Sequence, residues 1–138
     1  MEREKQIIIT CIVCPMGCEI KLKVKEGKIE GMSGNKCPRG IEYAKREYYN
    51  PQRVLTTTVR LKGGKLPVVP VRTDRPIPKK MLKKCMRYLA KIEVRAPVQS
   101  GQVIVSNILN TGANVVSTRK LPCKNMRSQI FLNVYRQT

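Results

Sequence analysis

The chain has 138 residues, a formal net charge of +19, six cysteines and no histidine. This length allows one domain or two small ones, and no apolar run approaches the roughly 20 residues that a membrane span needs. The lack of histidine excludes mixed Cys/His zinc sites, and no acid–base pair stands in a recognisable setting among only nine carboxylates. These absences favour a non-catalytic electron-transfer or accessory role over independent catalysis. Because the N-terminus does not resemble a signal peptide, we expect a cytoplasmic protein.

The first segment predicts strands around a turn. The apolar run Ile7-Ile8-Ile9 indicates a buried strand over Gln6–Thr10 that leads into the first cysteine. Apolar and charged residues then alternate over Glu19–Lys25, which is the period-two pattern of a strand. A turn at Glu26-Gly27 starts a return strand, and the residues 31–35 indicate a loop.

Four cysteines lie within 27 residues, in the spacing C-x2-C-x3-C-x18-C-P. They are Cys11, Cys14, Cys18 and Cys37. A C-x2-C step turns two thiolates toward one point, and the third can face that point from the other side of the loop. The hairpin described above would bring the fourth back to them. We therefore predict a metal site, because four empty thiolates at one point would repel or oxidise.

The grouping of three cysteines plus one is typical of [4Fe-4S] loops, whereas zinc sites usually combine two separate C-x2-C pairs. The spacing favours a [4Fe-4S] cluster, with zinc as the alternative. A disulfide framework is the third interpretation, and the lack of a secretory leader disfavours it.

A short helix is predicted after the fourth cysteine. Pro38 suits the first helical position, and Asn50-Pro51 ends the helix after Tyr48 or Tyr49. Cys37 would then stand at a helix N-terminus, where the helix dipole favours its thiolate.

This stretch, from about Ile7 to Arg60, resembles the N-terminal iron–sulfur segment of the molybdopterin oxidoreductases. That family combines C-x2-C-x3-C with a later C-x-K-G, a short helix and a Y-x-P-x-R segment. This chain has Cys37-Pro38-Arg39-Gly40 and Tyr49-Asn50-Pro51-Gln52-Arg53 at the corresponding places, with Arg39 where that family has Lys. The resemblance implies a cluster but no molybdenum, since the hundreds of residues that hold the pterin are missing.

Over its whole length the chain is similar to a small family described by its conserved CxxC pairs, DUF1667. Members are often encoded beside an FAD-dependent glycerol-3-phosphate dehydrogenase and an NADH-oxidase-like flavoprotein. The resemblance implies a redox neighbourhood and a flavoprotein partner.

The second part of the chain predicts a small α+β unit. Thr56–Leu61 indicates a strand, Gly63-Gly64 a hairpin turn, and Leu66–Val71 a partner that Pro67 and Pro70 confine to a sheet edge. Two further strands are expected, at residues 103–105 and 114–117, with a turn between them.

An amphipathic helix is predicted after Pro76-Ile77-Pro78. Its apolar stripe contains Met81, Leu82, Cys85, Met86, Leu89 and Ile92, and its other side contains Lys79, Lys80, Lys83, Lys84, Arg87 and Lys91. We interpret the helix as packed on a core with a solvated basic side, in preference to the alternative of a dedicated binding face. We interpret Cys85 as a buried structural thiol.

Taken together, the sequence predicts an α+β protein. A four-cysteine domain of β-hairpin and helix covers residues 1–55, a small α+β domain covers 56–121, and 122–138 form a disordered or non-native tail with an exposed Cys123. The leading hypothesis is an iron–sulfur electron-transfer or accessory subunit of a flavin dehydrogenase, with the cluster held by Cys11, Cys14, Cys18 and Cys37. The alternative is a zinc-stabilised basic module, for which nucleic acid is a partner that charge alone supports and scarce aromatics disfavour.

Overall fold

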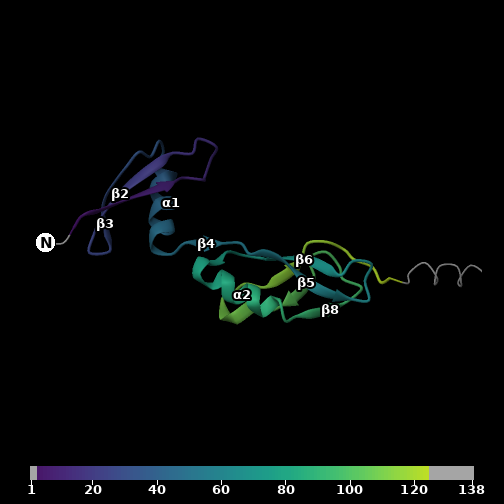
Figure 1. The fold of residues 1–138 in the computed structure, drawn as a ribbon. Helices are drawn as coiled ribbons and strands as arrows, with labels where there is room; N and C mark the ends of the chain where they lie inside the picture. Colours follow the sequence, from purple (N-terminus) through teal and green to yellow (C-terminus); the bar gives the residue numbers. More distant parts are fainter. Residues whose placement is uncertain (1–2, 125–138) are drawn as a thin grey trace, which may run out of the picture. The chain divides into compact units, whose positions relative to one another are not determined.

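The computed structural model describes residues 3–124 and divides the chain into two compact units. The N-terminal unit comprises Met1–Pro51 and the C-terminal unit Gln52–Thr138. Both units contain strands and a helix, which confirms the α+β class (Figure 1). The unit boundary precedes Gln52 because Gln52 and Arg53 pair with Pro78 and Ile77, which are also in the second unit.

The N-terminal unit is a three-stranded antiparallel sheet with one helix. Its elements are β1 (Lys5–Thr10), β2 (Glu19–Lys25), β3 (Lys28–Ser33) and α1 (Pro38–Tyr49), with strand order β1-β2-β3. The buried residues Ile20, Leu22 and Val24 of β2 form the core with Ala44 of α1 and with Cys11. Helix α1 therefore covers one face of this sheet, and β2 is the strand that carries most of the core.

Local chemistry explains these elements well. Burial alternates strictly along β2, so its lysines point away from the core, as the sequence pattern predicted. Glu26 and Gly27 both adopt positive φ, 51° and 74°, which is the conformation that two-residue hairpin turns require. Pro38 begins α1, and the helix ends at Tyr49 before Asn50-Pro51, so the predicted bounds are confirmed.

Two expectations for this unit were wrong. The run Ile7-Ile8-Ile9 lies in a strand, as predicted, but the strand is not buried: β1 is at the sheet edge, and Ile8 is 58% exposed because only one face of the sheet is covered. The predicted loop at residues 31–35 begins later, because Gly31–Ser33 continue β3 and pair with Lys23–Lys21. A register irregularity between Lys23 and Val24 absorbs the extra residue in β3.

The C-terminal unit is built on a five-stranded sheet of order β8-β5-β6-β10-β9. Its elements are β4 (Gln52–Arg53), β5 (Thr56–Lys62), β6 (Val68–Thr73), β7 (Ile77–Pro78), the 3₁₀ turn η1 (Lys79–Met81), α2 (Leu82–Leu89), β8 (Glu93–Arg95), β9 (Val103–Val105), the 3₁₀ turn η2 (Ile108–Asn110) and β10 (Val115–Ser117). Strands β5 and β8 are parallel, and helix α2 lies in the connection between β6 and β8 (Figure 1).

One continuous core supports this unit. Val59 of β5, Val69 and Val71 of β6 and Val115 of β10 are buried with Cys85 and Leu89 of α2. The predictions of a core-packed helix and of a buried Cys85 are therefore confirmed. The burial of Cys85 also raises the pKa of its thiol, because a thiolate there would lose its hydration.

Strand β6 lies at the centre of the sheet, so its predicted edge position was wrong. Pro67 precedes the strand, and the carbonyl of Pro70 accepts a hydrogen bond from the Thr118 N–H at 3.0 Å. Proline has no N–H, so Pro70 lacks only the hydrogen bond that this group would donate to the neighbouring strand. The pairing of β6 with β10 ends at Val71 and Ser117, so the missing bond lies just past the end of β10.

Three further boundaries differ from the sequence prediction. Helix α2 ends at Leu89, and the unpredicted β8 follows it, while Ile77-Pro78 forms β7 instead of a helix start. Cys123 is half-buried because it forms a β-bridge with Gly64. The backbone N–H of Lys124 donates a hydrogen bond to the Gly63 carbonyl beside it. The predicted tail therefore begins within the folded unit, and its residues 125–138 lie outside the described part.

No helix within residues 3–124 has the length and apolar character to cross a bilayer.

Candidate four-cysteine site

The loop between β1 and β2 carries the first three cysteines, and the N-terminus of α1 carries the fourth. The Cys11 N–H donates to the Cys18 carbonyl at 2.8 Å, so the two ends of the loop lie side by side. Gly17 within it has a φ of +60°, a conformation that favours glycine. The short hydrogen bond and the glycine together close the loop into a tight turn.

The start of α1 lies against this loop. A Cβ atom on Gly40 would be 3.9 Å from Cys11 Sγ and 3.1 Å from Ile20 Cδ1, so the absent side chain lets the helix approach. Cys37 stands at the helix N-cap, and its carbonyl accepts the Gly40 N–H at 3.2 Å. The C-P-x-G spacing thus places Cys37 one helical turn before Gly40, the glycine that faces the Cys11 side chain.

The segment before Cys37 is held closely. Gly34 has a φ of +93°, and a Cβ there would clash with the Glu19 carbonyl oxygen, so the loop passes directly over the start of β2. Asn35 donates its side-chain amide to the Cys37 carbonyl at 3.3 Å. These contacts return the chain to the cysteine loop, which is the role that the sequence assigned to the hairpin.

The four thiols differ in exposure and electrostatics. Cys11 is buried, whereas Cys14, Cys18 and Cys37 are half-buried. The pKa of Cys37 lies below its ordinary value, chiefly because the backbone N–H of Gly40 favours the thiolate; partial burial opposes this, and the neighbouring Arg39 supports it. Cys37 is therefore readily converted to the thiolate that metals bind.

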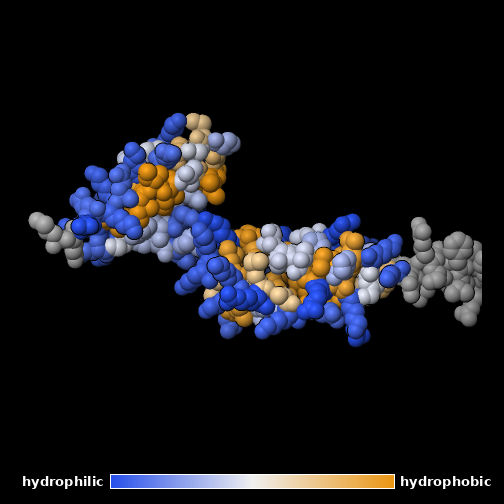
Figure 2. All heavy atoms as spheres, viewed as in Figure 1, coloured by the Kyte–Doolittle hydropathy of each residue, from blue (hydrophilic) through white to orange (hydrophobic). Residues whose placement is uncertain are grey.

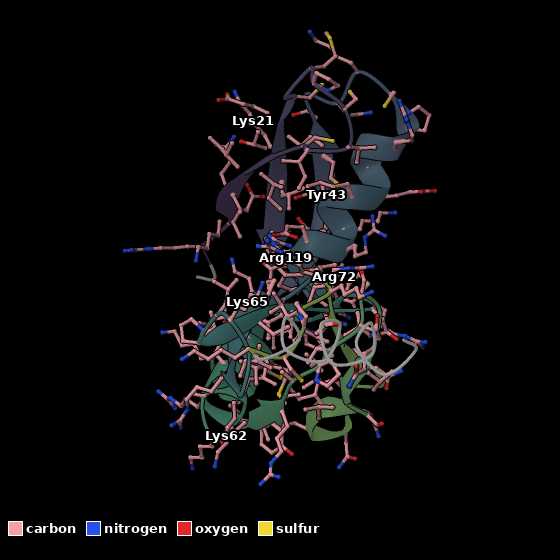
Figure 3. The ribbon with its side chains drawn as sticks, turned by 90° about the vertical axis from the view of Figure 1, so that its right-hand side faces the viewer. Lys21, Tyr43, Lys62, Lys65, Arg72 and Arg119 are labelled. Atoms are coloured by element: carbon pink, nitrogen blue, oxygen red, sulfur yellow. The ribbon has the colours of Figure 1, made fainter. Side chains whose placement is uncertain are left out.

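All six cysteines are free thiols, so the disulfide framework is not formed. Figure 3 shows several separate sulfur atoms at the end of the N-terminal unit where α1 begins. Within the described residues, however, no three cysteine, histidine or carboxylate side chains come close enough to hold one metal ion. The backbone contacts bring Cys11, Cys18 and Cys37 to one end of the unit without gathering their side chains around a common point.

The donor chemistry suits a thiolate-bound metal. Four cysteines on a tight loop and a helix N-terminus supply four soft ligands, which [4Fe-4S] clusters and Zn²⁺ both accept. Arg39 and the Gly40 N–H favour the thiolate of one of them. Exposed apolar side chains, Ile12 (69%) and Met16 (61%), flank the loop cysteines.

A groove on the same unit lies between β3 and the later turns of α1. It is lined by Ile29, Glu30, Gly31, Met32, Ile41, Lys45 and Tyr49. Tyr49 accepts the Ile29 N–H with its hydroxyl at 3.0 Å, which occupies a donor of this edge strand. The groove brings together one carboxylate and one ammonium group but no cysteine, so it is separate from the four-cysteine site.

The comparisons with known proteins bear mainly on the second unit. The family model described as "Protein of unknown function (DUF1667)" matches residues 38–119, which is more than half of the chain. This segment contains Cys85 but begins one residue after Cys37, so the match does not include the four candidate ligands. No curated protein matches the chain.

A solved structure is similar as well. The NMR structure of the Clostridium perfringens protein CPE0013 is 30% identical and superposes with a TM-score of 0.51. The match covers 54% of this chain and 89% of that one. The name of the clostridial protein indicates no ligand or activity.

Proposed function

The chain belongs to the DUF1667 family, and we propose that it is a metal-binding accessory protein, an iron–sulfur electron-transfer subunit that works with a flavin-dependent dehydrogenase. Cys11, Cys14, Cys18 and Cys37 would hold a [4Fe-4S] cluster. When bound, the cluster would supply one-electron transfer, so the two electrons of the dehydrogenase's reduced flavin would leave one at a time. The gene neighbourhood that the family resemblance implies supports a glycerol-3-phosphate type of dehydrogenase as partner.

One observation carries the proposal. The loop with three cysteines is closed by the Cys11–Cys18 hydrogen bond. The helix terminus that carries Cys37 lies next to this loop, because Gly40 faces Cys11 Sγ. The chain's own residues prepare this end of the unit for a metal. Gly17 closes the loop, Gly40 lets the helix approach, and Arg39 with the Gly40 N–H favours the Cys37 thiolate.

The alternative is zinc, which four thiolates also bind and which would stabilise a small unit without redox chemistry. The three-plus-one spacing favours the cluster over zinc. Nothing in the four-cysteine site itself favours nucleic acid as a partner, so the alternative function is a zinc-stabilised unit without that partner.

Anaerobic purification with iron, sulfide and zinc analysis tests the proposal. We expect a brown protein with four iron and four sulfide per chain, the composition of a [4Fe-4S] cluster, and broad absorbance near roughly 400 nm. Replacing Cys11, Cys14, Cys18 or Cys37 by Ser should abolish binding. The matched controls Cys85→Ala and Cys123→Ser remove thiols to which we assign no role in metal binding, so these variants should retain the metal.

Two results would contradict the proposal. A colourless protein with one zinc per chain and no reconstitutable cluster would establish the zinc alternative. Retention of metal by Cys37→Ser together with its loss in Cys85→Ala would show that the fourth ligand is assigned wrongly.

A further inference from the structure

Helix α2 and the preceding turn η1 present a continuous basic surface. We define the basic helical face as Lys79, Lys80, Lys83, Lys84, Arg87 and Lys91. All six side chains are exposed, and residues 79–91 contain no carboxylate. In the part of the chain that the structure describes, none of the six forms an ion pair. The face is therefore an uncompensated cluster of cations.

The placement of these charges does not serve the stability of the helix. Lysines 79, 80, 83 and 84 lie at its N-terminal end, where the helix dipole is already positive, and its first turn has no acidic residue. Lys83 and Arg87 are also like charges four residues apart, which is unfavourable. An acidic partner would relieve both effects, since it would supply the missing counter-charge.

Two apolar side chains flank the cations. Met86, which the sequence pattern assigned to the core, is 48% exposed, and Tyr88 is 39% exposed. At 100° per residue they lie on opposite sides of Arg87. Figure 2 shows hydrophilic and hydrophobic residues next to each other at the position of α2. Arg, Tyr and Met are enriched at protein interfaces, whereas a phosphate backbone offers no apolar counterpart for Met86.

The charge of the whole unit points the same way. Residues 52–124 contain sixteen Lys and Arg but only two carboxylates, Asp74 and Glu93, for a net charge of +14. Asp74 is already engaged by Asn114 and Arg75. A field of this strength would attract an acidic partner over distances comparable to the Debye length.

We propose that the basic helical face, with Met86 and Tyr88 at its flanks, is the surface on which an acidic protein docks. The partner is the flavin dehydrogenase of the proposed function, so the inference rests on that function and identifies the surface through which it acts. The cations direct the encounter, and the two flanking side chains provide apolar contact that slows dissociation.

The test measures association and dissociation rates between the full chain and purified FAD-dependent glycerol-3-phosphate dehydrogenase from the same source. Lys80→Glu/Lys83→Glu/Arg87→Glu reverses three charges of the face. The matched control is Lys62→Glu/Lys65→Glu/Arg95→Glu, which makes the same charge change at exposed positions of the sheet and its turn. Figure 3 labels Lys62 and Lys65. Circular dichroism and thermal melting verify that both variants fold.

We expect the first variant to slow association by about tenfold and the control by less than about threefold. Met86→Ala should accelerate dissociation by about fivefold with little effect on association. Equal losses in the two charge variants, or no binding by the wild-type chain, would overturn the proposal. Tighter binding of a 20-nucleotide DNA at physiological salt, unaffected by Met86→Ala, would assign the face to nucleic acid instead.

Metal analysis of the same preparations separates this inference from the proposed function. A chain with a bound cluster that binds the dehydrogenase, and whose association is equally slowed by the two charge variants, overturns the docking surface alone. A chain with zinc or no metal that binds through the basic helical face supports the surface and contradicts electron transfer.

Discussion

Cys37 differs from Cys85 in everything that controls thiol reactivity. The Gly40 N–H and the Arg39 guanidinium lower the pKa of Cys37, whereas burial raises the pKa of Cys85. Their positions explain the difference: Cys37 caps the start of α1, and Cys85 lies within α2 and faces the core of the second unit. One thiol is therefore suited to ligate a metal and the other to fill space.

This difference predicts a pH dependence in the metal-free protein. Because only the thiolate reacts, alkylation of Cys37 by iodoacetamide should reach half its maximal rate at a lower pH than an ordinary thiol. Arg39→Ala should move that midpoint upward, because one of the groups that lower the pKa is lost. Quantitative mass spectrometry of the Cys37 peptide measures the profile.

The neighbouring Lys36 is the control, since it is exposed and does not contribute to the pKa of Cys37. Lys36→Ala should leave the profile where it is, and Cys85 should stay unreactive in every variant. An Arg39→Ala profile identical to the wild type would show that Arg39 has no influence on the thiol.

At the scale of elements, the beginning of β5 depends on one buried hydroxyl. Thr73, at the end of β6, is completely buried, and its Oγ1 accepts the Leu55 N–H at 3.0 Å. The Thr73 N–H in turn donates to the Leu55 carbonyl at 2.9 Å. This reciprocal pair connects the end of the central strand to the segment that enters β5.

Thr73→Val should destabilise the second unit by about 1–3 kcal/mol, because the isosteric side chain leaves the Leu55 N–H buried without a partner. Urea unfolding monitored by circular dichroism measures the change. Thr57→Val is the matched control, since the Thr57 hydroxyl makes no hydrogen bond within residues 3–124 and its replacement should change stability by less than about 0.5 kcal/mol. Equal effects of the two substitutions would contradict the assignment.

At the scale of the whole molecule, the two units differ in core size and in charge. Among residues 3–124, the core of the second unit contains thirteen buried residues and that of the first only five. The N-terminal unit, residues 1–51, has ten basic and seven acidic residues, whereas most of the positive charge is in the second unit. A small core supplies little free energy of folding, so metal ligation would contribute a large share in the first unit.

We therefore expect two unfolding steps in the metal-free chain, with the N-terminal unit unfolding first. Bound metal should increase the stability of the N-terminal unit, which unfolds in the first step, and leave that of the second unit unchanged, because a ligand stabilises only the unit that binds it. Hydrogen exchange by mass spectrometry, with and without metal, assigns each step to its residues. A single transition in which metal protects both units equally would show that they unfold as one.

The sequence by itself determined the features that depend on local backbone chemistry. Alternation along Glu19–Lys25 determined which face of β2 is buried, Pro38 determined where α1 begins, and helical spacing placed Cys85 and Leu89 in a core. The four candidate ligands stay a prediction from spacing, because metal-binding loops depend on short separations along the chain. These patterns act over a few residues and need no knowledge of distant partners.

Only the tertiary structure decided what depends on distant segments. It placed β6 at the centre of the sheet, since the Pro70 position coincides with the end of β10. It also exposed Met86, which lies at the margin of the apolar stripe where the core has no further surface to cover it. Cys123 is likewise half-buried because of the Gly64 bridge, a pairing between residues 59 positions apart. Strand order and the extent of a covered face arise from such long-range contacts, which hydrophobic periodicity does not encode.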